Sequence, residues 1–157
     1  MRILGNILWH IPFFGFLSAF FSFLIGSLLV LAVVTAPIGL GLIQFSKFQL
    51  APFSYGMVSK NDLSAQQNQL WKSYSFIVKI IYFPFGLLFV LFGALQVFGL
   101  CLSIIGIPVA IVIAKSLGTY LQPVGKVCVP VAVAQEIATR KGSKDIEKYL
   151  GTTTNHK

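Results

Sequence analysis

Residues that carry out acid–base or metal chemistry are few in this sequence, and they are scattered along it. The carboxylates and histidines are Asp62, Glu136, Asp145, Glu147, His10 and His156. Their spacing fits no Ser/His/Asp set, no pair of catalytic carboxylates and no zinc motif. The two cysteines, Cys101 and Cys128, stand far apart in apolar surroundings, where a thiol packs as a small apolar group. The sequence therefore predicts neither an enzyme nor a metal or cofactor site.

Polar side chains within apolar stretches are the next candidates, because hydrocarbon offers a polar group no partner. Gln96 lies at the centre of one such stretch, and Gln44 and His10 lie in the other. For Gln96 we expect a hydrogen bond between helices, worth about 0.6–2 kcal/mol, with a pore-lining amide as the alternative. For His10, beside Trp9, an anchor at the membrane interface is favoured over a pH sensor.

Three lysines are candidates for contacts with anions. Lys47 and Lys115 occupy similar places after two proline breaks, and Lys126 follows. Each can bind a lipid headgroup, for about 1 kcal/mol per charge near the surface, or line a pore mouth that favours anions. The simplest alternative is that these lysines only set the orientation of the chain in the membrane.

The elements that must position these side chains are membrane helices. The chain has 157 residues, of which 56% are hydrophobic and 10% charged, and its mean hydropathy is +0.84. No Asp, Glu, Lys or Arg occurs from Ile3 to Ser46 or from Ile80 to Ala114. As helices these runs would measure roughly 66 and 52 Å, against a hydrocarbon core of about 30 Å. The chain is therefore expected to be an integral membrane protein.

Each run contains one segment long enough for a single crossing, Gly15–Val34 and Gly86–Ile105. Helix breaks are expected at Pro37, Gly106 and Pro108, since the residue before a proline is pushed out of the helical region. Small residues recur four apart on these segments, at Ser18, Ser22 and Gly26 and again at Gly99 and Ser103. Such faces let helix backbones approach closely, within one chain or between copies.

The two apolar runs resemble copies of one unit. Pro37, Leu50 and Pro52 recur at one constant interval along the chain as Pro108, Leu121 and Pro123. This repetition indicates an internal duplication. We therefore divide the chain into a first repeat (1–58), a polar cytoplasmic linker (59–75), a second repeat (76–129) and a basic cytoplasmic tail (130–157). Within the tail we expect two short helices, over residues 130–140 and 143–150.

The formal net charge of +8 is better explained by membrane topology than by nucleic-acid binding. The N-terminus, residues 47–79 and the C-terminal part of the chain are each net positive, so all three prefer the cytoplasm. The lysines of the middle region are Lys47, Lys60, Lys72 and Lys79, against Asp62. That preference needs an even number of crossings in each repeat. Parallel hairpins are therefore favoured over single crossings, which would invert the second repeat and place four lysines outside.

Three short motifs point to a known family: Asn6-Ile7-Leu8-Trp9, Ile104-Ile105-Gly106-Ile107-Pro108 and Leu121-Gln122-Pro123-Val124-Gly125. They resemble the YccF family of bacterial inner membrane proteins, whose domain is called the inner membrane component domain. The resemblance covers most of residues 1–130. It implies a bacterial inner membrane location and a short domain in two copies, and it offers no catalytic residue.

These observations predict an all-α integral membrane protein with both termini in the cytoplasm. Two tandem copies of a short membrane hairpin or re-entrant unit are joined to amphipathic interfacial helices. The favoured function is a homo-oligomeric channel or transport pore for ions or small solutes. The alternative is a non-catalytic scaffold or accessory subunit that binds anionic lipid, or a partner protein through the tail. The expected partners are membrane lipids and further copies of the chain, and nucleic acid is not among them.

Overall fold

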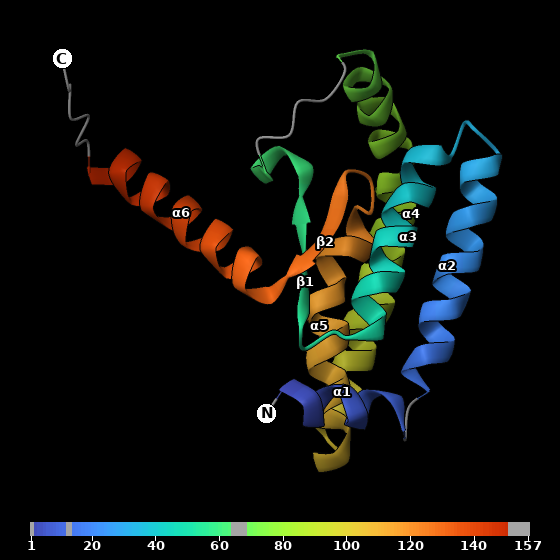
Figure 1. Ribbon diagram of the computed structural model, residues 1–157, viewed down its shortest axis with the longest axis vertical. Helices are drawn as coiled ribbons and strands as arrows, with labels where there is room; N and C mark the ends of the chain where they lie inside the picture. The colour runs from blue at the N-terminus through green and yellow to red at the C-terminus, as the bar shows by residue number, and fades with distance from the viewer. Residues whose placement is uncertain (1, 12–13, 64–68, 151–157) are drawn as a thin grey trace.

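A computed structural model describes residues 2–11, 14–63 and 69–150 (Figure 1). Its elements follow in the order α1 (Arg2–His10), α2 (Gly15–Leu31), α3 (Ala36–Leu50), β1 (Tyr55–Ser59), η1 (Lys60–Leu63), α4 (Gln69–Cys101), η2 (Ile104–Gly106), α5 (Ile107–Leu121), β2 (Lys126–Pro130) and α6 (Val131–Leu150). The fold is mostly helical, as the sequence predicts. Among the described residues it also contains a two-stranded ribbon, formed by β1 and β2, which the all-α prediction lacked.

The most apolar surface belongs to α2 and α4. In the described part of the chain, α4 is the one helix long and apolar enough to cross a membrane, over Lys72–Cys101. Only 17% of its most apolar window is buried, so most of that surface is open to lipid. Helices α1 and α2 meet the same criterion only together, as a pair bent by 76°.

The expected helix breaks lie slightly before the prolines. The first break occupies residues 32–35, and Pro37 is the second residue of α3. The second break ends with η2, whose last residue is Gly106, and Pro108 is the second residue of α5. Proline fits the first turn of a helix because the amide it lacks has no partner there. Each of the two prolines therefore starts a helix.

Glycines allow the helices of the first pair to pack closely. Gly26 of α2 is buried against Gly39 of α3, and a Cβ on Gly26 would lie 2.9 Å from the Gly39 carbonyl oxygen. In the second pair, a Cβ on Gly93 of α4 would lie 2.7 Å from a methyl group of Leu117 in α5. A larger residue at Gly26 would push α2 and α3 apart, whereas one at Gly93 would first displace the Leu117 side chain.

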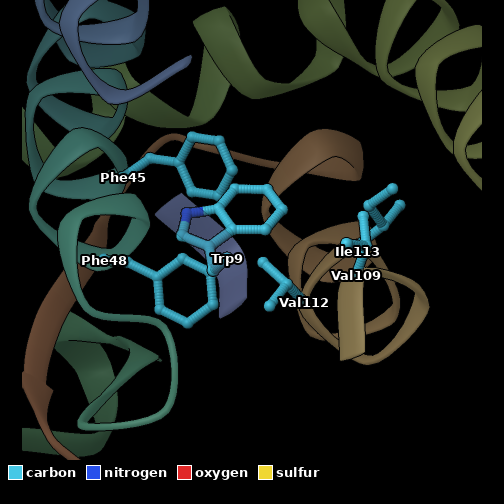
Figure 2. Close-up of a cluster of buried hydrophobic side chains, with 6 residues drawn as sticks. All are labelled: Trp9, Phe45, Phe48, Val109, Val112 and Ile113. Atoms are coloured by element: carbon cyan, nitrogen blue, oxygen red, sulfur yellow. The ribbon is translucent and has the colours of Figure 1, made fainter. Parts of the chain in front are cut away.

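The core lies where α1 crosses the ends of α3 and α5 (Figure 2). It consists of Trp9, Phe45, Phe48, Val109, Val112 and Ile113. Phe45 and Phe48 come from the second half of α3, whereas the three aliphatic residues come from the first half of α5. Helices α3 and α5 therefore run in opposite directions, as Figure 1 also shows.

The ribbon is antiparallel and centred on the pair Met57 and Cys128. The bounds of α3 and β1 correspond closely to those of α5 and β2. Helices α3 and α5 begin at positions 36 and 107, strands β1 and β2 begin at positions 55 and 126, and the interval along the chain is the same in both cases. Within each pair the two elements have the same length and opposite directions.

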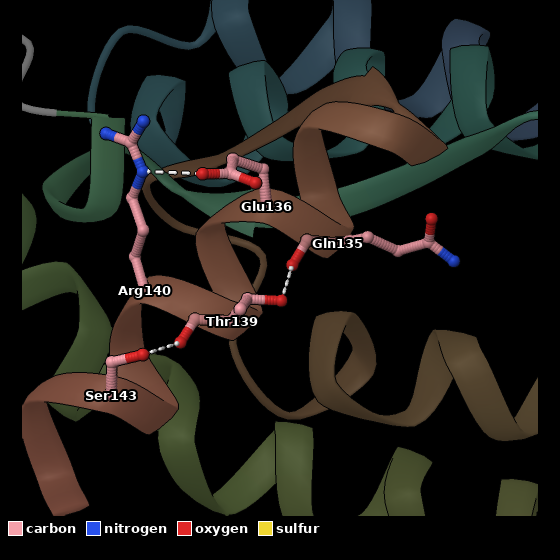
Figure 3. Close-up of polar contacts among 5 residues, drawn as sticks. All are labelled: Gln135, Glu136, Thr139, Arg140 and Ser143. Atoms are coloured by element: carbon pink, nitrogen blue, oxygen red, sulfur yellow. Dashed lines mark hydrogen bonds and ion pairs between the residues drawn. The ribbon is translucent and has the colours of Figure 1, made fainter.

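The tail differs from the prediction of two short helices, because α6 is continuous from Val131 to Leu150. Figure 3 shows the part of this helix from Gln135 to Ser143. The hydroxyl group of Ser143, expected to cap a new helix, instead donates to the carbonyl oxygen of Thr139 at 3.1 Å within one helix. Glu136 and Arg140 form an exposed ion pair of 2.9 Å one turn apart. Gly142 is tolerated inside the helix at a cost of about 1 kcal/mol relative to alanine.

Candidate functional site

A cavity of about 620 Å³ opens between α3, the beginning of α4 and one end of the ribbon. Four lysines line it: Lys60, Lys72, Lys79 and Lys126. Polar uncharged side chains complete the wall: Gln44, Ser59, Asn61, Gln69, Ser73 and Ser75. The part of the chain that the structure describes contributes no carboxylate to the lining.

The turn before β2 brings lysines from different elements to this cavity. Gly125 adopts a left-handed conformation (φ 75°), which a glycine reaches at little cost. The Lys60 amide donates to the Gly125 carbonyl oxygen at 2.8 Å, so the end of β1 meets the start of β2. As a result Lys60 and Lys126 lie at the same end of the ribbon.

Burial and pairing shape the charge of the cavity. Burial lowers the pKa of Lys126, and Asp62 partly opposes that effect. Asp62, in η1, forms an ion pair of 2.8 Å with Lys141 of α6. Its negative charge is therefore shared with a lysine that does not line the cavity.

The three polar intramembrane candidates lie in three different places. Gln44 lines the cavity, and its Oε1 accepts a hydrogen bond of 3.3 Å from the amide of Cys128. His10 lies at the end of α1, where Nε2 is 2.7 Å from the carbonyl oxygen of Leu50. Gln96 is exposed on α4, and no hydrogen bond joins it to another described residue. It lies near the end of α4 at Cys101, not at the centre of a helix.

The three lysines singled out from the sequence are also separated. Lys126 lines the cavity, whereas Lys47 borders a second groove, of about 650 Å³, beside the phenylalanines of α2. The ammonium group of Lys115 lies 5.3 Å from the centre of the Phe53 ring, a cation–π distance. The lysines therefore do not form one ring.

The predicted helix-packing residues behave differently in the two halves. On α2, Gly26 is buried against α3, Ser22 is half-buried and Ser18 accepts a hydrogen bond of 2.8 Å from the Gln49 side chain. In the second half of the chain, Gly99 near the end of α4 and Ser103 just after it are exposed, and a Cβ on Gly99 would meet no described atom within 4 Å.

Sequence reasoning treated Lys60, Lys72 and Lys79 only as orientation signals. The signal that pointed toward these three lysines was the net positive charge of residues 47–79, between the apolar runs. For metals, the described residues contain no group of three or more potential protein ligands.

The opening motif of the chain holds α1 in place. Asn6 donates to the hydroxyl oxygen of Ser54 at 3.0 Å and accepts from the Phe53 amide at 3.1 Å. The Trp9 indole donates to the Gln49 carbonyl oxygen at 2.8 Å. These contacts join α1 to the end of α3 and the turn before β1, so they tie the start of the chain to the segment that ends near Ser54.

The same stretch is the one that a family model recognises. Residues 4–55 match the YccF inner membrane component domain. The predicted resemblance to this family is thus confirmed over α1, α2, α3 and the first residue of β1. The YccF match, together with the apolar α4, supports an inner membrane protein. It does not extend to residues 76–129, where we predicted a second copy. No curated protein and no solved structure matches the chain.

Proposed function

We propose that this protein is a homo-oligomeric channel or transport pore for ions or small solutes in the bacterial inner membrane. The observation that carries the proposal is the opposed arrangement of two similar segments, α3 with β1 and α5 with β2. Elements α3 and β1 recur at one constant interval as α5 and β2, with equal lengths and reversed directions. Such bounds support the internal duplication that the sequence predicts.

Inverted repeats are the architecture of many transporters, in which the substrate site lies between the two halves. The lysine-lined cavity has this position. It is bounded by Gln44 of the first half and by Lys79 and Lys126 of the second. The antiparallel ribbon also favours the inverted alternative over the parallel hairpins preferred from lysine counts.

The ribbon is a second observation in favour of a pore, because its open edges need contact with water or with protein. A two-stranded sheet leaves backbone amides and carbonyls unpaired along its outer edges, and such groups are not left facing lipid. Strand β2 packs on α3, and α3 in turn packs on the apolar helix α2. If the ribbon lies at membrane depth, its free edges must face water or another copy of the chain.

Gln96 supports self-association. Its amide is exposed beside Leu95 and Phe92, each 69% exposed, and lacks a hydrogen-bond partner among the described residues. An amide in hydrocarbon gains from a partner, and glutamine supplies both a donor and an acceptor to its own copy. Exposed Gly99, one turn away, permits close approach of a second backbone.

Oligomeric state and conductance test the proposal together. We expect native mass spectrometry in nanodiscs to give a ring of four or more copies, and planar bilayers to conduct. Gln96→Leu should lower the oligomer number or change the conductance, whereas Phe98→Leu, an apolar change at another exposed position, should change neither. A monomer or dimer, or bilayers that stay silent although insertion is verified, would refute the pore.

Cysteine labelling tests the inverted arrangement. Helix α1, which contains Leu4, and the short helix η1 after β1, which contains Asn61, lie at opposite ends of the ribbon (Figure 1). In a cysteine-free background we expect an impermeant maleimide to label Leu4→Cys from outside the cell and Asn61→Cys only after permeabilisation. This expectation follows from the preference of lysine-rich segments for the cytoplasm. Protection of both positions would instead support parallel hairpins with a cytoplasmic N-terminus.

The scaffold alternative also has a supporting observation. Helix α6 extends away from the helices (Figure 1) and has no buried residue. A polar helix with one exposed Glu136–Arg140 pair suits a soluble partner rather than lipid. If the tail is a docking element, a chain ending at Pro130 should lose a specific partner in pull-downs yet keep its oligomer number and conductance.

A further inference from the structure

We infer that the lysine-lined cavity binds a phosphate-type oxyanion, carried either by a lipid headgroup or by a soluble phosphorylated molecule. The inference goes beyond the proposed pore, because binding can be measured without any transport. It depends on charge, on hydrogen-bond donors and on size.

The charge of the cavity is strongly unbalanced. Four lysines line it, and the described residues add no carboxylate to the lining. Asp62, the acid beside it, forms an ion pair with Lys141. Like charges that share a partly buried space repel one another, and an anion between them removes that repulsion. Half-burial of Lys126, which lowers its pKa, strengthens the need for a counter-charge.

The lining is also rich in hydrogen-bond donors. Each lysine ammonium carries three donors and no acceptor, a set that suits the oxygens of a phosphate group. The Lys79 ammonium reaches the corner at Gly125, 3.9 Å from the point where a Cβ would lie. The Gln44 oxygen accepts a hydrogen bond from the Cys128 amide. The NH2 group of Gln44 has no acceptor among the described residues and remains available as a donor.

Size and position exclude a bare ion as a full occupant. About 620 Å³ falls within the range of roughly 300–1,000 Å³ typical of organic ligand sites. Phe76 and Ile77 form an apolar part of the wall, directly before the uncharged run that starts at Ile80. The cavity thus joins a cationic end to the membrane surface of α4, as an amphiphilic phosphate would require.

Two probes separate the sources. The full chain in phosphatidylcholine nanodiscs would be titrated with pyrophosphate by calorimetry. In parallel, native mass spectrometry would compare retention of phosphatidylglycerol with that of phosphatidylcholine. Binding of pyrophosphate supports a soluble ligand, and preferential retention of phosphatidylglycerol alone supports a lipid headgroup. If the wild-type chain does neither, the inference is overturned.

Variants locate the binding. The double variant Lys72→Gln/Lys79→Gln is expected to weaken binding at least tenfold, whereas Lys144→Gln/Lys148→Gln on α6 should stay within twofold. Equal losses in both would mean that net charge, not the cavity, attracts the anion. If the first variant misfolds, Lys72→Arg/Lys79→Arg should keep binding. Binding without conductance would refute the pore alone, and conductance without binding would refute the anion site alone.

Discussion

A single cysteine introduced at Met57 should form a disulfide with the native Cys128. These residues face each other at the centre of the ribbon. Hydrogen bonds from Lys60 to Gly125 and from Val131 to Ser54 place the pair at a position without ladder hydrogen bonds. There the Cα atoms lie about 4.5 Å apart, within the range of about 4.4–6.8 Å that a disulfide spans. The change is made with Cys101 replaced by serine, so that Cys128 is the only other thiol.

The bond would close a loop of about 70 residues, for which the chain-entropy relation gives about 4 kcal/mol. For a chain of this length that corresponds to a rise in Tm of roughly 10 °C. Purified protein in detergent would be oxidised mildly, run on non-reducing gels and melted with and without reductant. Val58→Cys is the matched control, because its side chain points to the opposite face of the ribbon. If Met57→Cys stays reduced, or Val58→Cys crosslinks as well, the register of the ribbon is wrong.

Two further changes test the packing and the charge of the cavity. Gly41→Val should destabilise the fold by about 1–3 kcal/mol or more in thermal unfolding, since a Cβ there overlaps the Pro123 carbonyl oxygen. The control Gly118→Ala should be neutral or mildly stabilising, because a Cβ there meets no described atom within 4 Å. Lys126→Met should raise stability near neutral pH, because burial lowers the pKa of this lysine in the folded chain, and the gain should shrink as the pH rises toward 10.5, where the unfolded lysine also loses its proton. A gain that is constant over this pH range would mean that the charge of Lys126 is not its cause.

Apolar patterning predicts part of this fold well, because the bilayer imposes it. The uncharged runs contain α2 and most of α4, and the opening motif supplies the core residue Trp9. The ribbon could not be predicted, since its short strands show no polar alternation and each gains its partner only from a segment far away in the sequence. The continuous α6 was missed because a serine cap signal also occurs inside helices, where the hydroxyl bonds the preceding turn.

The candidate site was predictable only one residue at a time. Lys126 and Gln44 stood out individually, yet the cavity needs lysines from η1, α4 and β2 together. Their meeting depends on the left-handed turn at Gly125, and although a glycine indicates such a turn, no local pattern predicts which distant lysines it brings together. Gln96 lies near the end of a helix and not at its centre chiefly because α4 begins at Gln69, well before the predicted start at Gly86, and ends at Cys101, one turn before the predicted end at Ile105.

The bend between α1 and α2 has no counterpart in α4, which is one continuous helix. Shifted by the interval that relates α3 to α5, α1 corresponds to positions 73–81, the early turns of α4. In the first half this piece turns by 76° and packs over the turn before β1, whereas in the second half it continues straight past the turn before β2. Ser73, Ser75 and Lys79 of this uninterrupted part of α4 line the cavity, so the start of α4 forms one of its walls. Pro84 lies inside α4 just after that piece, where the missing amide leaves the helix easiest to bend.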